Sequence, residues 1–263
     1  MNSMGGADLN NQVVVVTGGS GLLGSKIVED SIKQGFTVIS LDITESKYKS
    51  SKFRHVHCDI SSQSQVNSAL ESFTNPKEIV ALVHCAALDP KVTSNDSVAT
   101  PFEDQSLETI SREFDVSIRG GLNVIQAFLK LIGNDWETNR SIVLMGSDLG
   151  VISPDQRVYR LEDGTQTFFK PISYSILKHG IVGMTKYLAT MLAERNIRVN
   201  CISPGPILDQ QPSALIKELE SRIPMGRLAS VSEIVGVVNF LTSDLSNYVT
   251  GQNIVVDGGR TIW

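Results

Sequence analysis

Three side chains in the second half of the chain have the types and the order that proton transfer needs. Tyr174 and Lys178 are four positions apart in YSILK, so on a helix they share one face. An ammonium beside a phenol is expected to lower the phenol's pKa from about 10 towards neutral pH, which makes it a usable acid or base. Ser147 closes an apolar run in IVLMGSDLG and can donate a hydrogen bond to the same substrate oxygen. The trio predicts an acid–base site acting on a carbon–oxygen group.

A glycine-rich turn near the N-terminus suits a dinucleotide. It reads VVVVTGGSGLLG over residues 13–24, following a valine run and opening a stretch of helical period. Glycines let the backbone approach a pyrophosphate, and the helix that follows offers free N–H groups and the positive end of its dipole. The alternative is a merely tight turn. The expected cofactor contacts here are Gly18, Ser20, Gly21, Leu22 and Leu23.

The next strand-like run, TVISLD, ends in an acidic residue that favours NAD(H). Asp42 lies 18 positions after Gly24 (42 − 24), where a carboxylate accepts hydrogen bonds from the adenosine ribose and repels a 2′-phosphate. No Arg or Lys stands at Gly19, Ser20 or Ile43 to bind such a phosphate. NAD(H) is therefore favoured over NADP(H), and Ile43 is expected to line the cofactor.

A weaker signal follows the third strand-like run. The Asp59 carboxylate can accept a hydrogen bond from the exocyclic amine of an adenine, and Ile60 stands beside it. With the glycine turn and Asp42, this pair predicts an adenine dinucleotide. Hydride transfer then accompanies the proton transfer at Tyr174.

Short β-branched runs alternate with stretches of helical period, which predicts β-α-β units and a parallel sheet covered on both faces. Strands are expected at Val13–Val16, Thr37–Leu41, His55–His57, Ile79–His84, Ser141–Met145, Arg198–Ile202 and Ile254–Val256. Helices are expected around 22–34, 62–73, 105–132, 172–195, 213–221 and 230–243. No linker or repeat divides the chain. The expected fold is α/β: a Rossmann-type doubly wound, seven-stranded parallel sheet in one domain over residues 1–263.

Composition limits the partners and the location. The chain has 263 residues, 41% of them hydrophobic and 19% charged, which is typical of globular proteins. A net charge of −5 without any basic run argues against nucleic acid, and no apolar run is long enough for a membrane helix. The N-terminus lacks a secretory pattern, and the three cysteines are widely spaced beside apolar runs. We expect a cytoplasmic protein without disulfides, and the four histidines predict no metal site.

These motifs resemble the short-chain dehydrogenase/reductase family from about residue 10 to the C-terminus. The resemblance implies that Tyr174 is the general acid/base and that Lys178 binds the nicotinamide ribose and tunes Tyr174. It implies that Ser147 orients the carbonyl or hydroxyl of the substrate. The segments that carry it are VVVVTGGSGLLG, GSDLG, YSILK followed by HGIVGMTKYLA, IRVNCISPGPI and YVTGQNIVVDGG.

The resemblance also extends the cofactor site. Pro204, Gly205 and Ile207 match the loop that holds the nicotinamide, with the Ile207 backbone binding its carboxamide. Asp42 and Asp59 match the family's ribose and adenine positions. The implied reaction is the NAD(H)-dependent interconversion of a secondary alcohol and a ketone.

The sequence departs from the family at several points. After the fourth strand the usual Asn-Asn-Ala-Gly reads His84-Cys85-Ala86-Ala87, so the side-chain contact that braces the sheet is expected to be missing. Cys85, Ala86 and Ala87 are still expected to line the cofactor. Ser117 stands where the family has the helix Asn of its proton relay, and its hydroxyl could hold the relay water instead. The glycine spacing, Gly-x-x-Gly-x-x-Gly, is typical of the family's longer, sugar-nucleotide-modifying branch.

Long connections are expected at the carboxyl edge of the sheet, where open α/β sheets bind ligands. They span residues 88–104 and 151–171, and 206–226 is expected to form a lid. Ser147 and Tyr174 are 27 positions apart (174 − 147), about twice the usual family spacing, because of the insertion at 151–171. Polar residues of both signs there favour a carbohydrate or sugar-derived substrate. They are Asp155, Gln156, Arg157, Tyr159, Arg160, Glu162, Asp163 and Gln166.

Two alternatives stay open. A 3-oxoacyl thioester reductase shares most of these motifs, although such enzymes usually take NADPH, which Asp42 disfavours. A non-catalytic cofactor-binding protein is the other, and the retained Ser147, Tyr174 and Lys178 argue against it. A looser resemblance points to proteins of flagellin or surface-polysaccharide modification. By family resemblance we expect a homo-oligomer, a dimer or tetramer, and the apolar patterns at 105–132 and 172–195 permit this.

Overall fold

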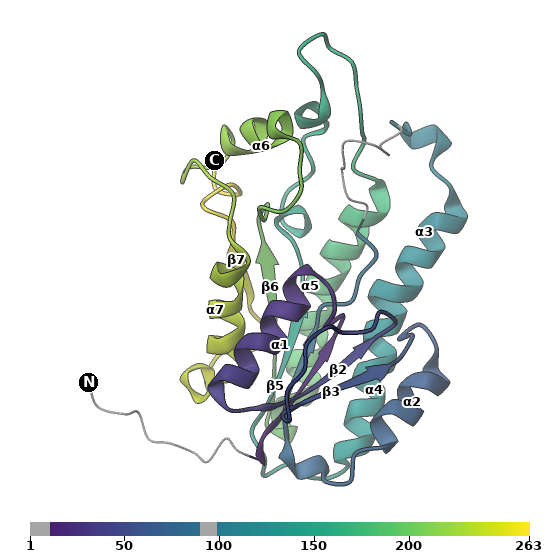
Figure 1. Cartoon of the computed structure of the whole chain (residues 1–263), viewed down its shortest axis with the longest axis vertical. Coiled ribbons are helices and arrows are strands. Elements are labelled where there is room, and N and C mark those ends of the chain that lie inside the picture. Colours follow the sequence, from purple (N-terminus) through teal and green to yellow (C-terminus); the bar gives the residue numbers. More distant parts are fainter. Residues whose placement is uncertain (1–10, 90–98) are drawn as a thin grey trace, which may run out of the picture.

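The described part of the chain is built on one parallel sheet. The structure, a computed structural model, describes residues 11–89 and 99–263, where seven strands lie in that sheet (Figure 1). They are β1 (Val13–Thr17), β2 (Thr37–Asp42), β3 (Phe53–His57), β4 (Ile79–His84), β5 (Arg140–Met145), β6 (Ile197–Pro204) and β7 (Asn253–Val256). The seven predicted strands are confirmed. Half of the expected connection 88–104, residues 90–98, and the N-terminal residues 1–10 lie outside the described residues.

The strand order is β3-β2-β1-β4-β5-β6-β7, with every neighbouring pair parallel. The chain winds outward from β1 to β3, then returns to place β4 on the other side of β1 and continues to β7. The order reverses between β1 and β4, and the carboxyl ends of these two strands mark the crevice where doubly wound sheets bind ligands. The predicted Rossmann-type fold is confirmed.

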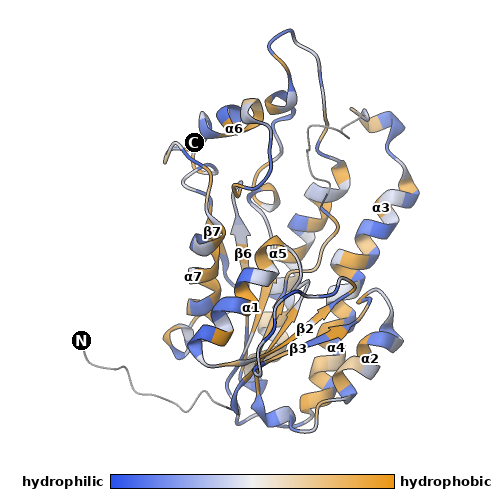
Figure 2. Ribbon diagram, in the orientation of Figure 1, coloured by the Kyte–Doolittle hydropathy of each residue, from blue (hydrophilic) through white to orange (hydrophobic). Residues whose placement is uncertain are grey.

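Helices cover both faces of the sheet. They are α1 (Leu22–Gln34), α2 (Gln63–Glu71), α3 (Leu107–Phe114), α4 (Gly121–Ile132), α5 (Ile172–Leu192), α6 (Ser213–Glu220) and α7 (Val231–Thr242). Val14 and Val16 pack with α1 and α7, whereas Val13 and Val15 pack with α2, α4 and α5. Successive strand residues point to opposite faces, so an unbroken valine run supplies two cores at once. Figure 2 shows these apolar strands between helices whose polar faces point outward.

The stretch predicted as one helix over 105–132 is divided into three pieces. Between α3 and α4 the turn widens into a π-helical segment, Asp115–Gly120. Here the helix passes close to β4: a Cβ on Gly121 would lie 3.0 Å from Nε2 of His84. Such π-helical widenings are frequent at functional sites.

Two findings bear on location and metal binding. Among the described residues, no helix has the length and apolar character needed to cross a bilayer. In the same part of the chain, no three His, Cys, Asp or Glu side chains gather as a metal site requires. The cytoplasmic location stays a prediction.

Candidate active site

In the glycine turn between β1 and α1, the backbone segments pack so closely that side chains would not fit. A Cβ on Gly24 would lie 2.0 Å from the Gly18 carbonyl oxygen, and Gly18 itself has φ +69°. The N–H of Gly21 closes the turn on that same oxygen at 3.0 Å. Helix α1 begins at Leu22 without a side-chain cap, so its first N–H groups are not bonded by a capping side chain. The arrangement forms a backbone cradle for an anion at the start of a helix.

Asp42 is fixed against this turn. The Ser20 N–H donates to its Oδ2 at 2.9 Å and the Thr44 N–H to its Oδ1 at 2.8 Å. The Ser20 hydroxyl in turn donates to the Thr44 carbonyl at 2.7 Å. Ile43, beside the carboxylate, is 59% exposed. The carboxylate predicted to bind a ribose therefore lies beside the cradle predicted to bind phosphates, and these residues fit an adenine dinucleotide.

The two residues of the third predicted contact, after β3, already have partners within the protein. The Asp59 carboxylate accepts from the N–H of Ser61 at 2.9 Å and from its hydroxyl at 2.7 Å. The Ile60 side chain is buried in the core, and its carbonyl accepts from the Asn123 amide at 2.9 Å. The adenine contact is left to Asp59 and the Ile60 backbone, and it stays a prediction.

The segment after β4 runs beside the glycine turn. Cys85 donates its N–H to the Thr17 carbonyl at 3.1 Å, and the Ala86 N–H donates to Oγ1 of Thr17 at 3.3 Å. A Cβ on Gly18 would lie 2.7 Å from the Ala86 nitrogen. Cys85 and Ala86 therefore border the cradle, while contact of Cys85, Ala86 and Ala87 with a cofactor stays a prediction.

The expectation that no side chain braces this strand is wrong, because His84 does so. Its Nδ1 lies 2.8 Å from the Thr17 hydroxyl and its Nε2 lies 3.4 Å from the Ser117 carbonyl. Burial lowers the pKa of His84 to about 4, so the ring is neutral at pH 7. A carbonyl only accepts, so Nε2 carries the proton and Nδ1 accepts from Thr17. His84 thus ties β1 and β4 to the π-helical segment.

Ser117 is buried within that π-helical segment. The structure shows its carbonyl, rather than its hydroxyl, in contact with His84. The part of the hydroxyl in a proton relay stays a prediction.

The predicted trio comes together at the carboxyl end of β5. Lys178 is buried and donates from Nζ to the Met145 carbonyl at 3.1 Å. The same Nζ lies 5.5 Å from the ring centroid of Tyr174. Ser147 lies close enough to Tyr174 to lower the pKa of its hydroxyl. The α5 spacing and the end of β5 bring these groups together as predicted.

The pKa of Tyr174 moves opposite to the expectation. Burial raises it, the charges of Asp89 and Asp148 raise it further, and the neighbouring Ser147 side chain only partly opposes them. Burial also lowers the pKa of Lys178. Desolvation disfavours the charged form of both groups. Tyr174 is consequently protonated at neutral pH, the form that donates a proton.

The loop after β6 lies across the end of β7. Strand β6 ends at Pro204, and the Gly205 N–H donates to the Val256 carbonyl at 2.9 Å. The Ile207 carbonyl accepts from the Gln211 amide at 2.7 Å. The loop predicted to hold a nicotinamide therefore also leaves the carboxyl edge of the sheet.

Comparison with known proteins identifies the protein family of this chain. A short-chain dehydrogenase family model, described as enoyl-(acyl carrier protein) reductase, matches residues 20–261. The chain belongs to the short-chain dehydrogenase/reductase family. Among solved structures, it resembles a short-chain dehydrogenase from Leptospira borgpetersenii with bound NAD+. The TM-score is 0.86 and the identity 34%, over 100% of this chain and 99% of the other.

Curated relatives of this dehydrogenase/reductase act on different substrates. A 3-oxoacyl-(acyl-carrier-protein) reductase of Thermotoga maritima is 28% identical over 97% of this chain and 99% of its own. A ribulose-forming D-arabinitol 2-dehydrogenase of Scheffersomyces stipitis is 30% identical over 97% and 95%. The post-translational flagellin modification protein A of Campylobacter coli is 26% identical over 95% and 98%. The family is shared, while substrates differ at these identities.

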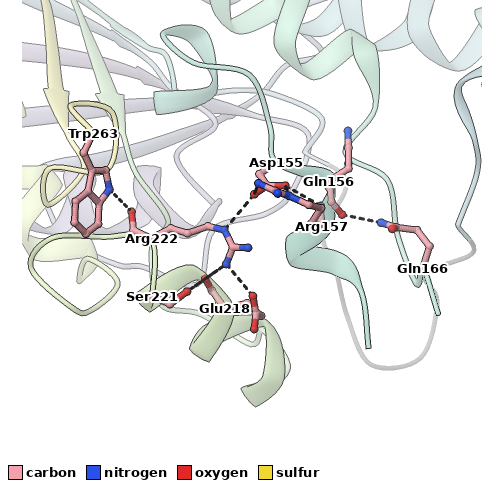
Figure 3. Close-up of polar contacts among 8 residues, drawn as sticks. All are labelled: Asp155, Gln156, Arg157, Gln166, Glu218, Ser221, Arg222 and Trp263. Carbon is pink, nitrogen blue, oxygen red and sulfur yellow. Dashed lines mark hydrogen bonds and ion pairs between the residues drawn. The ribbon is translucent and has the colours of Figure 1, made fainter. Parts of the chain in front are cut away.

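The insertion of this family member is packed against the segment predicted as a lid. Arg222 donates to Asp155 at 3.2 Å and to Glu218 at 2.8 Å, and its carbonyl accepts from the indole of Trp263 at 3.1 Å (Figure 3). Beneath these contacts, Val158 joins an apolar cluster from α6 and the turns after it: Leu215, Leu219, Ile223 and Leu228. The insertion, the segment predicted as a lid and the C-terminal residue Trp263 are therefore in contact with one another.

Many polar groups of the insertion bond to one another instead of lining the site. Asp155 pairs with Arg157 at 2.8 Å, and the Arg160 guanidinium donates to Gln166 at 2.8 Å. Tyr159 is different, because it is partly buried and close enough to Tyr174 to influence its pKa. Burial raises the pKa of Tyr159 to about 12. Of the eight insertion residues, Tyr159 is the one whose position affects the pKa of Tyr174.

Sequence reasoning missed a buried ion pair beside Ser147. Asp148 accepts the Ser147 hydroxyl at 2.9 Å and is paired with Arg260, which stands 112 positions later in the C-terminal segment. Asp148 is 3% exposed and Arg260 8%. An acidic residue directly after the strand-ending serine was the available signal, although nothing in the sequence indicates its partner.

Proposed function

We propose that this enzyme is an NAD(H)-dependent oxidoreductase that interconverts a secondary alcohol and a ketone. The observation that carries the proposal is the meeting of Ser147, Tyr174 and Lys178 at the carboxyl edge of the sheet, close to the cradle formed by the glycine turn. Family membership establishes an oxidoreductase, and the geometry of the site supports the more specific reaction.

The residues divide the chemistry among them. A nicotinamide, when bound, supplies or accepts the hydride. Tyr174, protonated at neutral pH, donates its proton to the ketone oxygen, and in the reverse direction it accepts the proton of the alcohol. Ser147 hydrogen-bonds the same oxygen and orients it. Lys178, held at the end of β5 by the Met145 carbonyl, binds the nicotinamide ribose.

The preference for NAD(H) rests on Asp42. Its carboxylate is already oriented by Ser20 and Thr44, so it can bind two ribose hydroxyls without reorganisation, whereas a 2′-phosphate would meet its charge. Neighbouring Ile43 offers no cation to neutralise that phosphate. The related Leptospira structure with NAD+ bound supports this preference.

Asp42→Asn tests the cofactor preference. The amide keeps an oxygen for one backbone N–H but loses the charge that repels phosphate, so the preference for NADH over NADPH should fall at least about tenfold. Fluorescence titration with each nucleotide measures it. Asp59→Asn, at the end of the next strand, is the matched control and should leave the ratio unchanged. An unchanged ratio in Asp42→Asn would remove Asp42 as the selector.

We propose a carbohydrate or sugar-derived substrate. The buried Asp148–Arg260 pair and Tyr159 place polar groups near the trio, and the D-arabinitol dehydrogenase is a relative acting on a polyol. The 3-oxoacyl thioester reductase remains a second candidate, favoured by the Thermotoga relative and by the description of the family model. Turnover of polyols, sugars, nucleotide sugars and 3-oxoacyl thioesters, each with NADH and NADPH, separates the two. Turnover of thioesters alone would overturn the sugar proposal.

We also propose a homo-oligomer, a dimer or tetramer. Helix α5 exposes Ile176, Tyr187 and Met191, the latter two at 67% and 65%, and an apolar helix face is commonly covered by a partner. Sedimentation velocity measures the mass in solution, and a monomer at micromolar concentration would contradict the proposal.

A further inference from the structure

A second lysine lies on the face of the acid–base tyrosine. Nζ of Lys170 is 3.7 Å from the ring centroid of Tyr174, closer than the 5.5 Å of Lys178. Its side chain is only 11% exposed. In sequence the two lysines stand four positions before and four after the tyrosine, in KPISYSILK. The ring therefore has two ammonium groups near it, of which the family motif accounts for one.

The insertion holds Lys170 in this position through its backbone. Gln156 accepts from the Lys170 N–H at 2.9 Å and donates to the Lys170 carbonyl at 2.9 Å, so one amide side chain binds both sides of the residue. Gln166 donates to the Gln156 carbonyl at 2.8 Å, the contact seen in Figure 3. The Lys170 ammonium is also fixed by Asp89, at 2.9 Å, from the segment after β4. A surface lysine rarely has this many constraints.

Several groups around Tyr174 disfavour its ionisation, so a cation close to the ring matters for its protonation state. Asp89 follows β4, Asp148 follows β5, Tyr159 comes from the insertion, and all three raise the pKa of Tyr174, as burial does. Ser147 opposes them, and the cations Lys170 and Lys178 lie 3.7 Å and 5.5 Å from the centroid of the ring. A cation on the ring face is attracted more strongly to the phenolate than to the phenol, because ionisation makes the ring more electron-rich.

We propose that Lys170 is a positioning residue that favours ionisation of Tyr174 and so sets the pH range of the acid–base step. The insertion at 151–171 then has a role besides substrate contact, because its Gln156 clamp places this lysine. The inference rests on the proposed function only in taking Tyr174 as the acid/base. Asp89 both anchors Lys170 and offsets its charge.

The direct test observes the phenol itself. Protein saturated with NAD+ and labelled at the tyrosine Cζ with carbon-13 is titrated by NMR, and the Tyr174 signal is assigned by its loss in Tyr174→Phe. Lys170→Met should show less phenolate than the unmodified protein at each alkaline pH, and Lys170→Arg should restore it. Lys33→Met, which removes an exposed lysine of α1, is the control of equal charge. Equal phenolate in Lys170→Met and the unmodified protein would overturn the inference.

Kinetics supply the second readout. In Lys170→Met, kcat/KM at pH 7 for alcohol oxidation should fall about tenfold and recover as the pH rises, because removing a cation raises the pKa of a nearby acid. Asp89→Asn should shift the profile to lower pH, since one negative charge is removed. If Lys170→Met fails to fold, Lys170→Gln is used in its place. If Tyr174→Phe stays active, the proposed function fails; if it is inactive while Lys170→Met keeps the original profile, only the inference fails.

Discussion

Tyr174→Phe should abolish measurable turnover, with kcat lower by about 10²–10⁴-fold, while NADH affinity changes little. The substitution removes one hydroxyl, which neighbours Ser147 and which is protonated at neutral pH. Without it no side chain in this position donates the proton that the ketone oxygen needs. The ring remains to fill its place between Lys170 and Lys178.

Steady-state kinetics and a fluorescence titration with NADH separate the two effects. Tyr187→Phe is the matched control, because Tyr187 is on the same helix but 67% exposed. That variant should behave like the unmodified enzyme. Activity retained by Tyr174→Phe would remove the mechanism, whereas loss of NADH binding together with activity would indicate a structural role.

Arg260→Met should lower the free energy of unfolding by about 3–5 kcal/mol. The substitution leaves Asp148, 3% exposed, without the cation that compensates its charge. The carboxylate would still accept from Ser147 and from the Leu149 N–H, but hydrogen bonds from neutral groups offset only part of the cost of burying a charge. The expected loss is large for a single side chain near the C-terminus.

Urea unfolding, followed by circular dichroism, measures the change. The double variant Asp148→Asn/Arg260→Met should recover much of the lost stability, because neither partner then carries a buried charge. Arg227→Met breaks an ion pair of 2.6 Å whose side chains are 48% and 41% exposed, and it should cost less than about 1 kcal/mol. Equal losses in Arg260→Met and Arg227→Met would show that burial of the Asp148 pair does not matter.

The fold was predictable because its signals are local. In runs such as Val13–Val16 every residue is apolar, which is the pattern of a strand buried on both faces. The predicted strand ends lie within one or two residues of those in the structure. The helix over 105–132 was less accurate. Its π-helical interruption lies where Gly121 approaches His84, a contact between elements that no local pattern describes.

The candidate site was predictable where a motif fixes the geometry. The i, i+4 spacing of Tyr174 and Lys178 places both on one face of α5. The direction of the tyrosine pKa was not predictable from that spacing, since burial depends on everything packed around the ring. The bracing role of His84 was missed for a related reason, because a histidine in place of the family residue reveals no partner until Thr17 and Ser117 are located.

The sequence by itself determined the sheet, the glycine cradle and the order of Ser147, Tyr174 and Lys178, because each follows from the type and spacing of residues close together in the chain. Only the tertiary structure decided which charges act on that trio. Asp89 and Lys170 are 81 positions apart, and Asp148 and Arg260 are 112 apart. Their pairing depends on where loops from different strands meet, and the strength of each charge depends on how much water the surrounding layer excludes.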